Sequence, residues 1–268
     1  MSEAQLFVAT TFTEIYERVL VKPLFRPFAE ELVARLKPTR GDSLIDVACG
    51  TGIAARIGRE TLGADARIVG VDVAPAMLAV ARTVAPTIDW RDGSAAALPI
   101  TDHERFSMLT CHQGLQFMAD KQAVAHEMRR ALTPGGRVAI ATWRPLQDIP
   151  GMRHLNAIVE KHVGPIVDSR HSFGDPKALA TLLVDGGFRD VAVDTFAHDV
   201  RFSDGELFAR LNAMAVIGMS DKGKSMSEAE RGELASRVAA ESADLIARST
   251  KDGAFVLPLS TNIATARV

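Results

Sequence analysis

Two glycines and an aspartate have the spacing that a nucleoside-binding site requires. Gly50 and Gly52 lie between an apolar segment, residues 43–47, and a stretch that favours a helix, and Asp72 ends the next apolar segment, 22 residues after Gly50. Glycine lets a backbone turn sharply and approach a ligand closely, and the amides that begin a helix carry partial positive charge. A carboxylate at the end of the next strand can accept two hydrogen bonds from ribose hydroxyls. Together these residues predict a site for an adenosine-containing cofactor.

The glycine motif alone leaves the identity of the cofactor open. Gly50-x-Gly52-x-x-Ala55 also satisfies the loose dinucleotide fingerprint G-x-G-x-x-G/A. A tight turn at the glycines and a helix cap at Asp72 would explain either motif by itself without a ligand. In the context of a strand, a turn and a helix, the two motifs together favour ligand binding.

The residues around these motifs alternate between short apolar segments and segments with helical periodicity. The apolar segments that we expect to be strands are residues 43–47, 67–73, 87–92, 106–111, 137–143, 191–202 and 254–266. The segments that we expect to be helical are residues 3–37, as two helices interrupted near Pro23 and Pro27, and residues 76–84, 123–132, 153–163, 176–185 and 204–250, the last broken at 218–226. Residues 133–136 are expected to be a turn from helix to strand. This alternation predicts an α/β fold with a doubly wound, mostly parallel sheet of seven strands.

Length and composition limit the class of protein. The chain has 268 residues, of which 47% are hydrophobic and 24% charged, as in ordinary folded proteins with a sizeable core. Its formal net charge of -2 provides no positive field that would hold a nucleic acid or an anionic membrane surface. Cys49 and Cys111 are too few for a disulfide framework or a structural zinc site, and no signal peptide or long apolar span is recognised. We therefore expect a cytoplasmic protein with no nucleic-acid partner and no membrane insertion.

We expect one domain that covers residues 1–268. Within it, residues 1–40 would form N-terminal helices, and residues 41–145 would form the cofactor-binding core. Residues 146–175 and 204–250 would be helical additions that, with the N-terminal helices, form a cap over the acceptor site. The protein is expected to be a monomer or a homodimer.

The segment Leu44-Ile-Asp-Val-Ala-Cys-Gly-Thr-Gly52 resembles the first motif of class I S-adenosylmethionine-dependent methyltransferases, in which an acidic residue, here Asp46, lies four positions before the first glycine. The resemblance continues, in the order and spacing of the family, through residues 70–78, 91–99, 106–120 and 132–137. Within this family, the sequence is similar to the ubiquinone and menaquinone biosynthesis type and to bacterial small-molecule methyltransferases. The resemblance implies a Rossmann-like methyltransferase fold, S-adenosyl-L-methionine as the cofactor and S-adenosyl-L-homocysteine as the product.

The resemblance also assigns a set of residues to the cofactor. They are Asp46, Ala48, Cys49, Gly50, Thr51, Gly52, Asp72, Val73, Met77, Asp92, Gly93, Ser94, Cys111, Gln113 and Gln116. The backbone of residues 48–52 would lie beside the methionine moiety, and Asp46 would order this loop and the amino group. Asp72 would bind the ribose hydroxyls, whereas Asp92 would accept a hydrogen bond from the adenine amino group. Val73 and Met77 would pack near the adenine, and Gly93 and Ser94 would line the same pocket.

Three residues are candidates for the acceptor side of the site. His112 could act as a general base, because an imidazole can take a proton from a hydroxyl or an activated carbon near neutral pH. The alternative is a histidine that anchors a loop. Tyr16 and Trp143 are candidate substrate contacts, and an aromatic face tolerates a sulfonium well. For both, ordinary packing is the alternative.

We therefore predict an enzyme that transfers a methyl group by in-line displacement to an oxygen or carbon of a small, largely apolar acceptor of aromatic, polyketide or quinone-like type. Such a transfer requires no metal, and the histidines show no ligand spacing. Two alternatives are an NAD(P)-dependent oxidoreductase and an S-adenosylmethionine-binding protein without transferase activity. The first is disfavoured because Tyr16 is the only tyrosine, so the chain has no catalytic Tyr-x-x-x-Lys pair.

Overall fold

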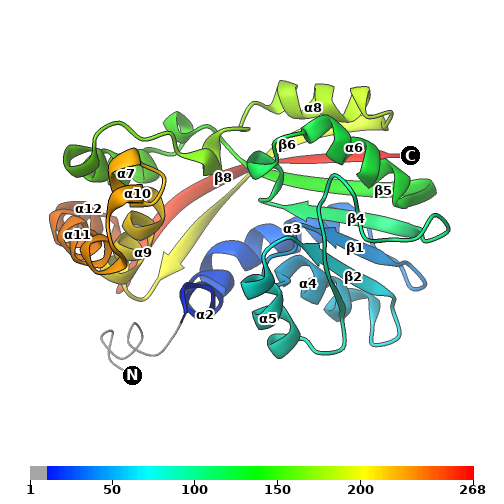
Figure 1. Ribbon diagram of the computed structural model, residues 1–268, viewed down its shortest axis with the longest axis horizontal. Helices are drawn as coiled ribbons and strands as arrows, with labels where there is room; N and C mark the ends of the chain where they lie inside the picture. Colours follow the sequence, from blue (N-terminus) through cyan, green and yellow to red (C-terminus); the bar gives the residue numbers. More distant parts are fainter. Residues whose placement is uncertain (1–10) are drawn as a thin grey trace. The chain divides into compact units, whose positions relative to one another are not determined.

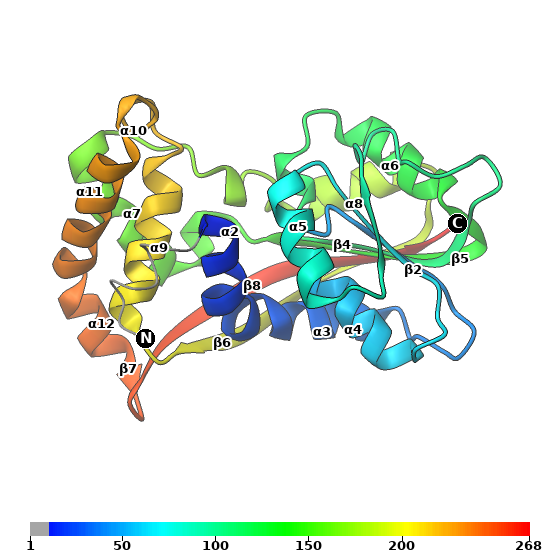
Figure 2. The ribbon, with the colours of Figure 1, turned by 60° about the horizontal axis from the view of Figure 1, so that its bottom comes forward.

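The computed structural model describes residues 11–268, shown in Figure 1 and Figure 2. Its contacts group these residues into two compact units. The first unit contains the described residues up to Trp143, together with Phe173–Phe196 and Thr261–Val268. The second unit contains Arg144–Ser172 and Ala197–Ser260. The predicted helical additions, residues 146–175 and 204–250, therefore fall mostly in the second unit.

The first unit is built on a mostly parallel sheet. Its strands are β1 (Leu44–Val47), β2 (Ile68–Asp72), β3 (Asp89–Asp92), β4 (Phe106–His112), β5 (Leu132–Trp143), and parts of β6 (Arg189–Phe202) and β8 (Ala254–Arg267). Across the described residues the strand order is β3-β2-β1-β4-β5-β8-β6. The first five strands in this order are parallel, and β8 is antiparallel to β5. The predicted α/β fold is confirmed, and the carboxyl ends of β1, β2 and β4 meet at one edge of the sheet, where such folds bind ligands.

Helices cover both faces of this sheet, as Figure 1 shows. The helices of this unit are α2 (Phe12–Ile15), the π-helix η1 (Tyr16–Phe25), α3 (Arg26–Arg35), α4 (Ile53–Leu62), α5 (Pro75–Val84), the 3-10 helix η2 (Leu115–Phe117), α6 (Lys121–Arg130) and α8 (Pro176–Asp185). Successive residues of a strand point to opposite faces. Leu44 therefore lies in a core cluster with Leu78 of α5, and Ile45 lies in another with Leu179 of α8.

Residues 133–136 do not form the turn that the sequence predicted. β5 begins two residues after α6 ends and includes the Thr-Pro-Gly-Gly segment. The N–H of Gly135 donates to the Val268 carbonyl at 3.1 Å, and the N–H of Val268 donates to the Gly136 carbonyl at 3.0 Å. The segment continues the strand because a residue distant in sequence supplies its hydrogen bonds, which local proline and glycine signals do not reveal.

The N-terminal helical segment also differs from the prediction of two separate helices. Thr11 begins it with a capping box, in which the Glu14 carboxylate accepts a hydrogen bond from the Thr11 N–H at 2.8 Å. α2, η1 and α3 follow one another without a break, and Pro23 lies inside the π-helix. π-Helical turns occur frequently at functional sites. The part of the prediction that covers residues 3–10 lies outside the described residues.

The second unit is mainly helical. Its elements are η3 (Leu146–Asp148), α7 (Pro150–Val163), η4 (Ser169–His171), α9 (Gly205–Ile217), α10 (Asp221–Ser225), α11 (Glu228–Glu241), α12 (Ala243–Ser249), β7 (Thr250–Lys251), and the remaining parts of β6 and β8. The expected break at 218–226 contains the short helix α10, and β7 was not predicted. Within residues 11–268 we find no helix whose length and apolar character would let it span a membrane.

A buried polar cluster ties the second unit together. The Arg170 guanidinium donates to the two carboxylate oxygens of Asp168 at 2.8 and 2.6 Å, and to the side-chain oxygen of Asn212 at 2.9 Å. Asn156 donates to the same carboxylate at 2.8 Å. Burial alone would raise the pKa of Asp168, but the hydrogen bonds and charge of Arg170 lower it to about 2. The carboxylate is therefore charged and fully paired.

Candidate active site

The glycine loop, residues 48–52 between β1 and α4, has a strained backbone. Ala48, Gly50 and Gly52 have positive φ angles of 56°, 56° and 86°. Gly52 is the left-handed residue from which α4 begins. A left-handed conformation costs an alanine about 1–2 kcal/mol. Backbone strain of this kind is found most often at active sites and ligand-binding sites. The geometry supports the predicted binding role of this loop.

The indole ring of Trp90 in β3 fills the space beside two glycines. A Cβ atom on Gly52 would lie 2.1 Å from this ring, and one on Gly70 of β2 would lie 2.3 Å from it. The ring is fixed by a hydrogen bond from its Nε1 to the Ala85 carbonyl at 2.9 Å. The glycine loop therefore rests on Trp90, a residue that the sequence analysis did not single out.

Two backbone amides hold the Asp72 carboxylate at the end of β2. The N–H of Gly50 donates to one oxygen at 2.7 Å, and the N–H of Ala74 donates to the other at 2.8 Å. The second contact does not cap α5 (Pro75–Val84), as the sequence had allowed, because Ala74 is the N-cap of this helix and no side chain caps it. Each carboxylate oxygen has two lone pairs, so each can accept a further hydrogen bond. The carboxylate is thus oriented in advance for a pair of neighbouring hydroxyls.

The predicted adenine side of the site lies at the same edge. β2 and β3 end in register, with Asp72 opposite Asp92. The structure brings these predicted residues to the edge: Val73, Met77, Asp92, Gly93 and Ser94. Val73 is 65% exposed, which is unusual for a valine next to a buried strand. Gly93 has no room for a side chain, since a Cβ there would lie 2.6 Å from Pro99.

Asp46 is almost fully buried at the end of β1. It is 1% exposed, and its carboxylate accepts hydrogen bonds from the Thr110 hydroxyl at 2.8 Å and from the Ala55 N–H at 3.2 Å. Burial raises the pKa of this carboxyl to about 7, because the two donors only partly offset the loss of water. Asp46 thus joins β1 to β4 and to the first turn of α4, as expected of a residue that orders the loop.

The segment that follows β4 packs directly against the glycine loop. A Cβ on Gly114 would lie 2.5 Å from the Ala48 side chain. Gln113 has a positive φ of 57°, and both Gln113 and Gln116 are buried. The Cys111 side chain lies in the core, where burial raises the pKa of its thiol to about 12. A cofactor contact from Cys111 would therefore have to come from its backbone.

His112 ends β4 beside a group of aromatic side chains. The Phe25 ring meets the His112 ring edge-on, with 6.1 Å between centroids, and Tyr16 lies 5.0 Å from Phe25. Trp143, at the end of β5, lies 6.4 Å from Phe25 and 5.0 Å from Phe28. The structure therefore brings all three predicted acceptor-side residues into one aromatic group.

Burial keeps two members of this group uncharged. The pKa of His112 is lowered to about 3 by burial, and its Nε2 atom has no hydrogen-bond partner within residues 11–268. The pKa of the Tyr16 hydroxyl is raised well above its usual value, first by burial and then by the charges of Glu17 and Asp72. Asp72, the residue assigned to the ribose, is thus one of the charges that act on Tyr16.

Comparison with known proteins decides the family. Residues 44–136 match the family model of a methyltransferase domain. The chain is 31% identical to the 2-phytyl-1,4-naphtoquinone methyltransferase of Thermosynechococcus vestitus over 175 residues, which cover 58% of this chain and 76% of that protein. The chain belongs to the class I S-adenosylmethionine-dependent methyltransferases.

Two further proteins resemble this methyltransferase. Nocamycin O-methyltransferase of Saccharothrix syringae is 30% identical over 66% of this chain and 69% of that protein. The solved structure of the YcgJ protein of Bacillus subtilis has a TM-score of 0.59 and 14% identity, covering 90% of this chain and 98% of that one, and it bears on the fold alone. The predicted enzyme class and cofactor are confirmed, and neither the oxidoreductase nor the non-catalytic alternative finds support.

The site of the methyltransferase fits S-adenosylmethionine. The two free lone pairs of Asp72 match the ribose hydroxyls, and a Cβ on Gly50 would meet nothing within 4 Å, so the loop offers bare backbone to a ligand. Exposed Val73 provides an apolar surface for a base. Bound here, the cofactor supplies an electrophilic methyl group on a sulfonium. Within residues 11–268, no three His, Cys, Asp or Glu side chains are grouped so that they could hold a metal ion.

Replacing Asp46 with asparagine is expected to remove a pH dependence of stability. Folding raises the pKa of Asp46 from 3.8 to about 7, so the folded methyltransferase binds an extra proton between these values and loses stability as the pH rises through them. Three pKa units correspond to about 4 kcal/mol. The free energy of unfolding of Asp46→Asn minus that of the wild type, from urea denaturation, should rise by about 4 kcal/mol between about pH 4 and pH 8.

The difference between the two proteins is needed because His112 acts in the opposite direction. Its lowered pKa makes stability fall as the pH falls below its usual value of 6.5, which masks Asp46 in the wild-type profile. A difference that stays constant across the pH range would contradict a buried Asp46 that titrates near neutrality.

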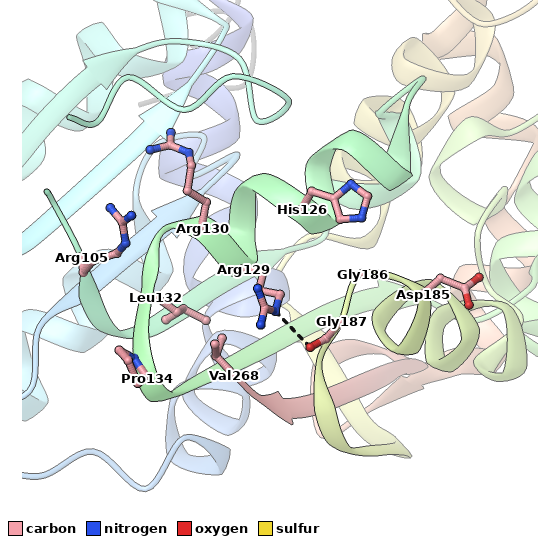
Figure 3. Close-up of a pocket in the computed structure, with 10 residues that line it drawn as sticks. All are labelled: Arg105, His126, Arg129, Arg130, Leu132, Pro134, Asp185, Gly186, Gly187 and Val268. Atoms are coloured by element: carbon pink, nitrogen blue, oxygen red, sulfur yellow. Dashed lines mark hydrogen bonds between the residues drawn. The ribbon is translucent and has the colours of Figure 1, made fainter. Parts of the chain in front are cut away.

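A separate depression of about 700 Å³ lies at the opposite edge of the sheet. It is lined by residues that include Leu132, where β5 begins, whereas the site described above lies where β4 ends. Figure 3 shows Arg129 in this depression, with its Nε donating to the Gly187 carbonyl at 3.0 Å. The depression is therefore distinct from the methyl-transfer site.

Proposed function

We propose that this methyltransferase acts on an oxygen or a carbon of an aromatic, polyketide or quinone-like acceptor. The observation that carries the proposal is the buried, unpartnered Nε2 of His112, which lies among aromatic side chains at the carboxyl edge of the sheet. The names of two relatives, which specify a naphthoquinone and nocamycin, support this acceptor class. The surrounding Phe25, Phe28 and Trp143 would give the acceptor an apolar site.

The residues along this edge of the sheet would bind different parts of the cofactor. Asp72 would hold the ribose, and the glycine loop and Asp46 would hold the methionine end of the cofactor. Val73, Met77, Asp92, Gly93 and Ser94 would hold the adenine. Tyr16 and Phe25 would place aromatic faces near the sulfonium and exclude water from it. Much of the rate enhancement would come from this alignment of acceptor and methyl group.

His112 would serve the acceptor as a neutral imidazole. Because its pKa is about 3, it is uncharged at physiological pH, so Nε2 can accept a hydrogen bond from an acceptor hydroxyl in one tautomer. The imidazole would then receive the hydroxyl proton as the oxygen forms its bond to the methyl carbon and the hydroxyl becomes acidic. This assigns His112 the role of general base.

Replacing His112 with glutamine is expected to lower kcat by about 10²-fold, the lower end of the usual contribution of a general base, because an imidazole with a pKa of about 3 is a weak base. The KM for S-adenosylmethionine should stay within about threefold of the wild-type value, because His112 is assigned to the acceptor and not to the cofactor. The measurement is transfer of radioactive methyl from S-adenosylmethionine to a panel of phenols, hydroquinones and polyketide enols.

The matched control is His126→Gln, since His126 is exposed on α6 and lines the depression at the other edge of the sheet. If kcat were unchanged in His112→Gln, His112 would not be the general base. Tight binding of S-adenosylmethionine with no transfer to any acceptor would instead favour a protein that binds the cofactor without catalysis.

Other expectations stay predictions. A cytoplasmic location accords with two free, buried cysteines, Cys49 and Cys111. The monomeric or homodimeric state and the absence of a nucleic-acid partner are likewise expected from the sequence. Analytical ultracentrifugation with and without S-adenosylhomocysteine would measure the first of these directly.

A further inference from the structure

A chain of hydrogen bonds connects three strands beside the proposed acceptor site. The side-chain Nε2 of Gln113, directly after β4, donates to the hydroxyl of Thr261 in β8 at 2.9 Å. The Thr261 hydroxyl donates in turn to the carbonyl of Thr142 in β5 at 2.8 Å, with a longer contact of 3.3 Å to the Asn262 carbonyl. All members of this chain belong to the first unit.

This chain of hydrogen bonds fixes which atom of the Gln113 amide is left without a partner. A threonine hydroxyl has one hydrogen, and both neighbours to which Thr261 can donate it are carbonyl oxygens. The Thr261 oxygen must therefore accept its other hydrogen bond, and only the NH₂ group of Gln113 can donate it. The Oε1 of Gln113 is consequently held as a pure hydrogen-bond acceptor.

That acceptor atom is buried and unsatisfied. Gln113 is 7% exposed, and its Oε1 has no hydrogen-bond partner within residues 11–268. Leaving a buried polar atom without a partner costs about 1–3 kcal/mol. The backbone of Gln113 adds strain, because its φ is 57° in a residue with a side chain. A buried polar atom without a partner and a strained backbone are typical of residues whose hydrogen bonds are completed by a ligand.

The position of Gln113 indicates which ligand completes it. The sites assigned to ribose and adenine lie at the ends of β2 and β3, on one side of β4 in the strand order. The Gln113 side chain bonds to β8, and its N–H donates to the Ala141 carbonyl of β5 at 2.9 Å, so it leans to the other side. That side carries Trp143 and the aromatic group around His112.

We propose that Gln113 is a specificity-determining residue that accepts a hydrogen bond from a hydroxyl of the acceptor, and that Thr261 is the residue that positions it. The proposal rests on the proposed function, and it reassigns Gln113 from the cofactor to the acceptor. His112 and Gln113 are successive residues, each with a buried atom that can accept a hydrogen bond. The acceptor class is therefore a dihydroxylated aromatic ring, with one hydroxyl at His112 and a second, retained hydroxyl at Gln113.

The test compares ligands that differ by one hydroxyl. Two pairs serve as probes: 2,3-dihydroxynaphthalene with 2-naphthol, and 1,4-dihydroxynaphthalene, kept reduced under nitrogen, with 1-naphthol. Dissociation constants are measured by calorimetry with S-adenosylhomocysteine bound. In at least one pair, the wild type should bind the dihydroxy compound about 10–100-fold more tightly, since a site built to accept from a hydroxyl rejects the analogue that lacks it.

Three variants separate specificity from structure. Gln113→Met keeps the side-chain volume and should reduce the ratio of the two dissociation constants to about one. Thr261→Val removes the positioning hydroxyl and should reduce the ratio at least about threefold, whereas Thr261→Ser restores the hydroxyl and should restore the ratio. The dissociation constant of S-adenosylhomocysteine should stay within about twofold in all three variants, which also shows that they are folded.

Several results would overturn the proposal. They are equal wild-type affinities within both pairs, absence of binding by all four probes, and an unchanged ratio in Gln113→Met. A loss of S-adenosylhomocysteine affinity in Gln113→Met with no change in the ratio would return Gln113 to the cofactor site. The proposed function is tested separately by cofactor binding and methyl transfer in the wild type, so it can stand when this inference fails.

Discussion

Replacing Asp72 with alanine is expected to weaken the binding of S-adenosylmethionine at least about 100-fold, or about 3 kcal/mol. The carboxylate orients the glycine loop through the Gly50 N–H, at 2.7 Å, and the residue before α5 through the Ala74 N–H, at 2.8 Å. Alanine would leave both amides without this partner and would remove the acceptor for the ribose hydroxyls. Hydrogen bonds to a charged group are worth about 1.5–3 kcal/mol each, so the loss is large even if the loop partly rearranges.

Isothermal titration calorimetry with S-adenosylmethionine measures this loss. Asp72→Asn should give an intermediate affinity, because its carbonyl oxygen can still accept from one amide while its NH₂ group opposes the other. The matched control is Asp65→Ala, an exposed aspartate in the turn between α4 and β2. An Asp72→Ala protein that binds within about fivefold of the wild type would limit Asp72 to holding the backbone at Gly50 and Ala74.

The second large effect is expected from Gly52→Ala, which should cost about 3–5 kcal/mol of stability and abolish measurable cofactor binding. Two separate causes act at this position. The φ of 86° is strained for a residue with a side chain, and the new methyl group would lie 2.1 Å from the Trp90 ring. Because Trp90 is hydrogen-bonded at Ala85, the ring cannot turn aside without losing that contact.

Two other glycines allow these causes to be separated. Gly135 has a φ of 75° and nothing within 4 Å of its Cβ position, so Gly135→Ala tests backbone strain alone. Gly70 has no positive φ but lies against the same indole at 2.3 Å, so Gly70→Ala tests the clash alone. Urea denaturation should rank Gly52→Ala as the most damaging of the three. If Gly52→Ala cost no more than Gly135→Ala, Trp90 would not be the support of the loop.

The central features of the fold and the cofactor side of the site could be predicted from the sequence. Parallel strands that are buried on both faces appear as apolar runs, and Asp72 is conspicuous because it ends such a run. The helices 75–84 and 176–185 were recognisable from Pro75 and Pro176 in their first turns. Local signals were sufficient here because the helices form their hydrogen bonds between nearby residues, whereas the strands are recognised from their apolar runs without knowledge of their partners.

Features that depend on distant partners escaped prediction. Thr261 is 148 residues from Gln113, and nothing in its own neighbourhood marks it as a partner. Trp90 was missed for the same reason, because its role follows from glycines on two other elements. Residues 133–136 were mispredicted because their strand hydrogen bonds are made with Val268. That the helical additions cap the acceptor stays a prediction, as does the expected single-domain organisation.

The placement of Trp90 and Trp143 gives the enzyme two intrinsic fluorophores with different neighbours. The chain has two tryptophans, one against the glycine loop and one in the aromatic group beside His112. Indole emission responds to changes in local polarity and contact, so cofactor and acceptor should each alter the emission of a different residue. Variants that keep a single tryptophan would then follow the arrival of each ligand separately in a stopped-flow instrument, which makes the order of binding directly observable without a label.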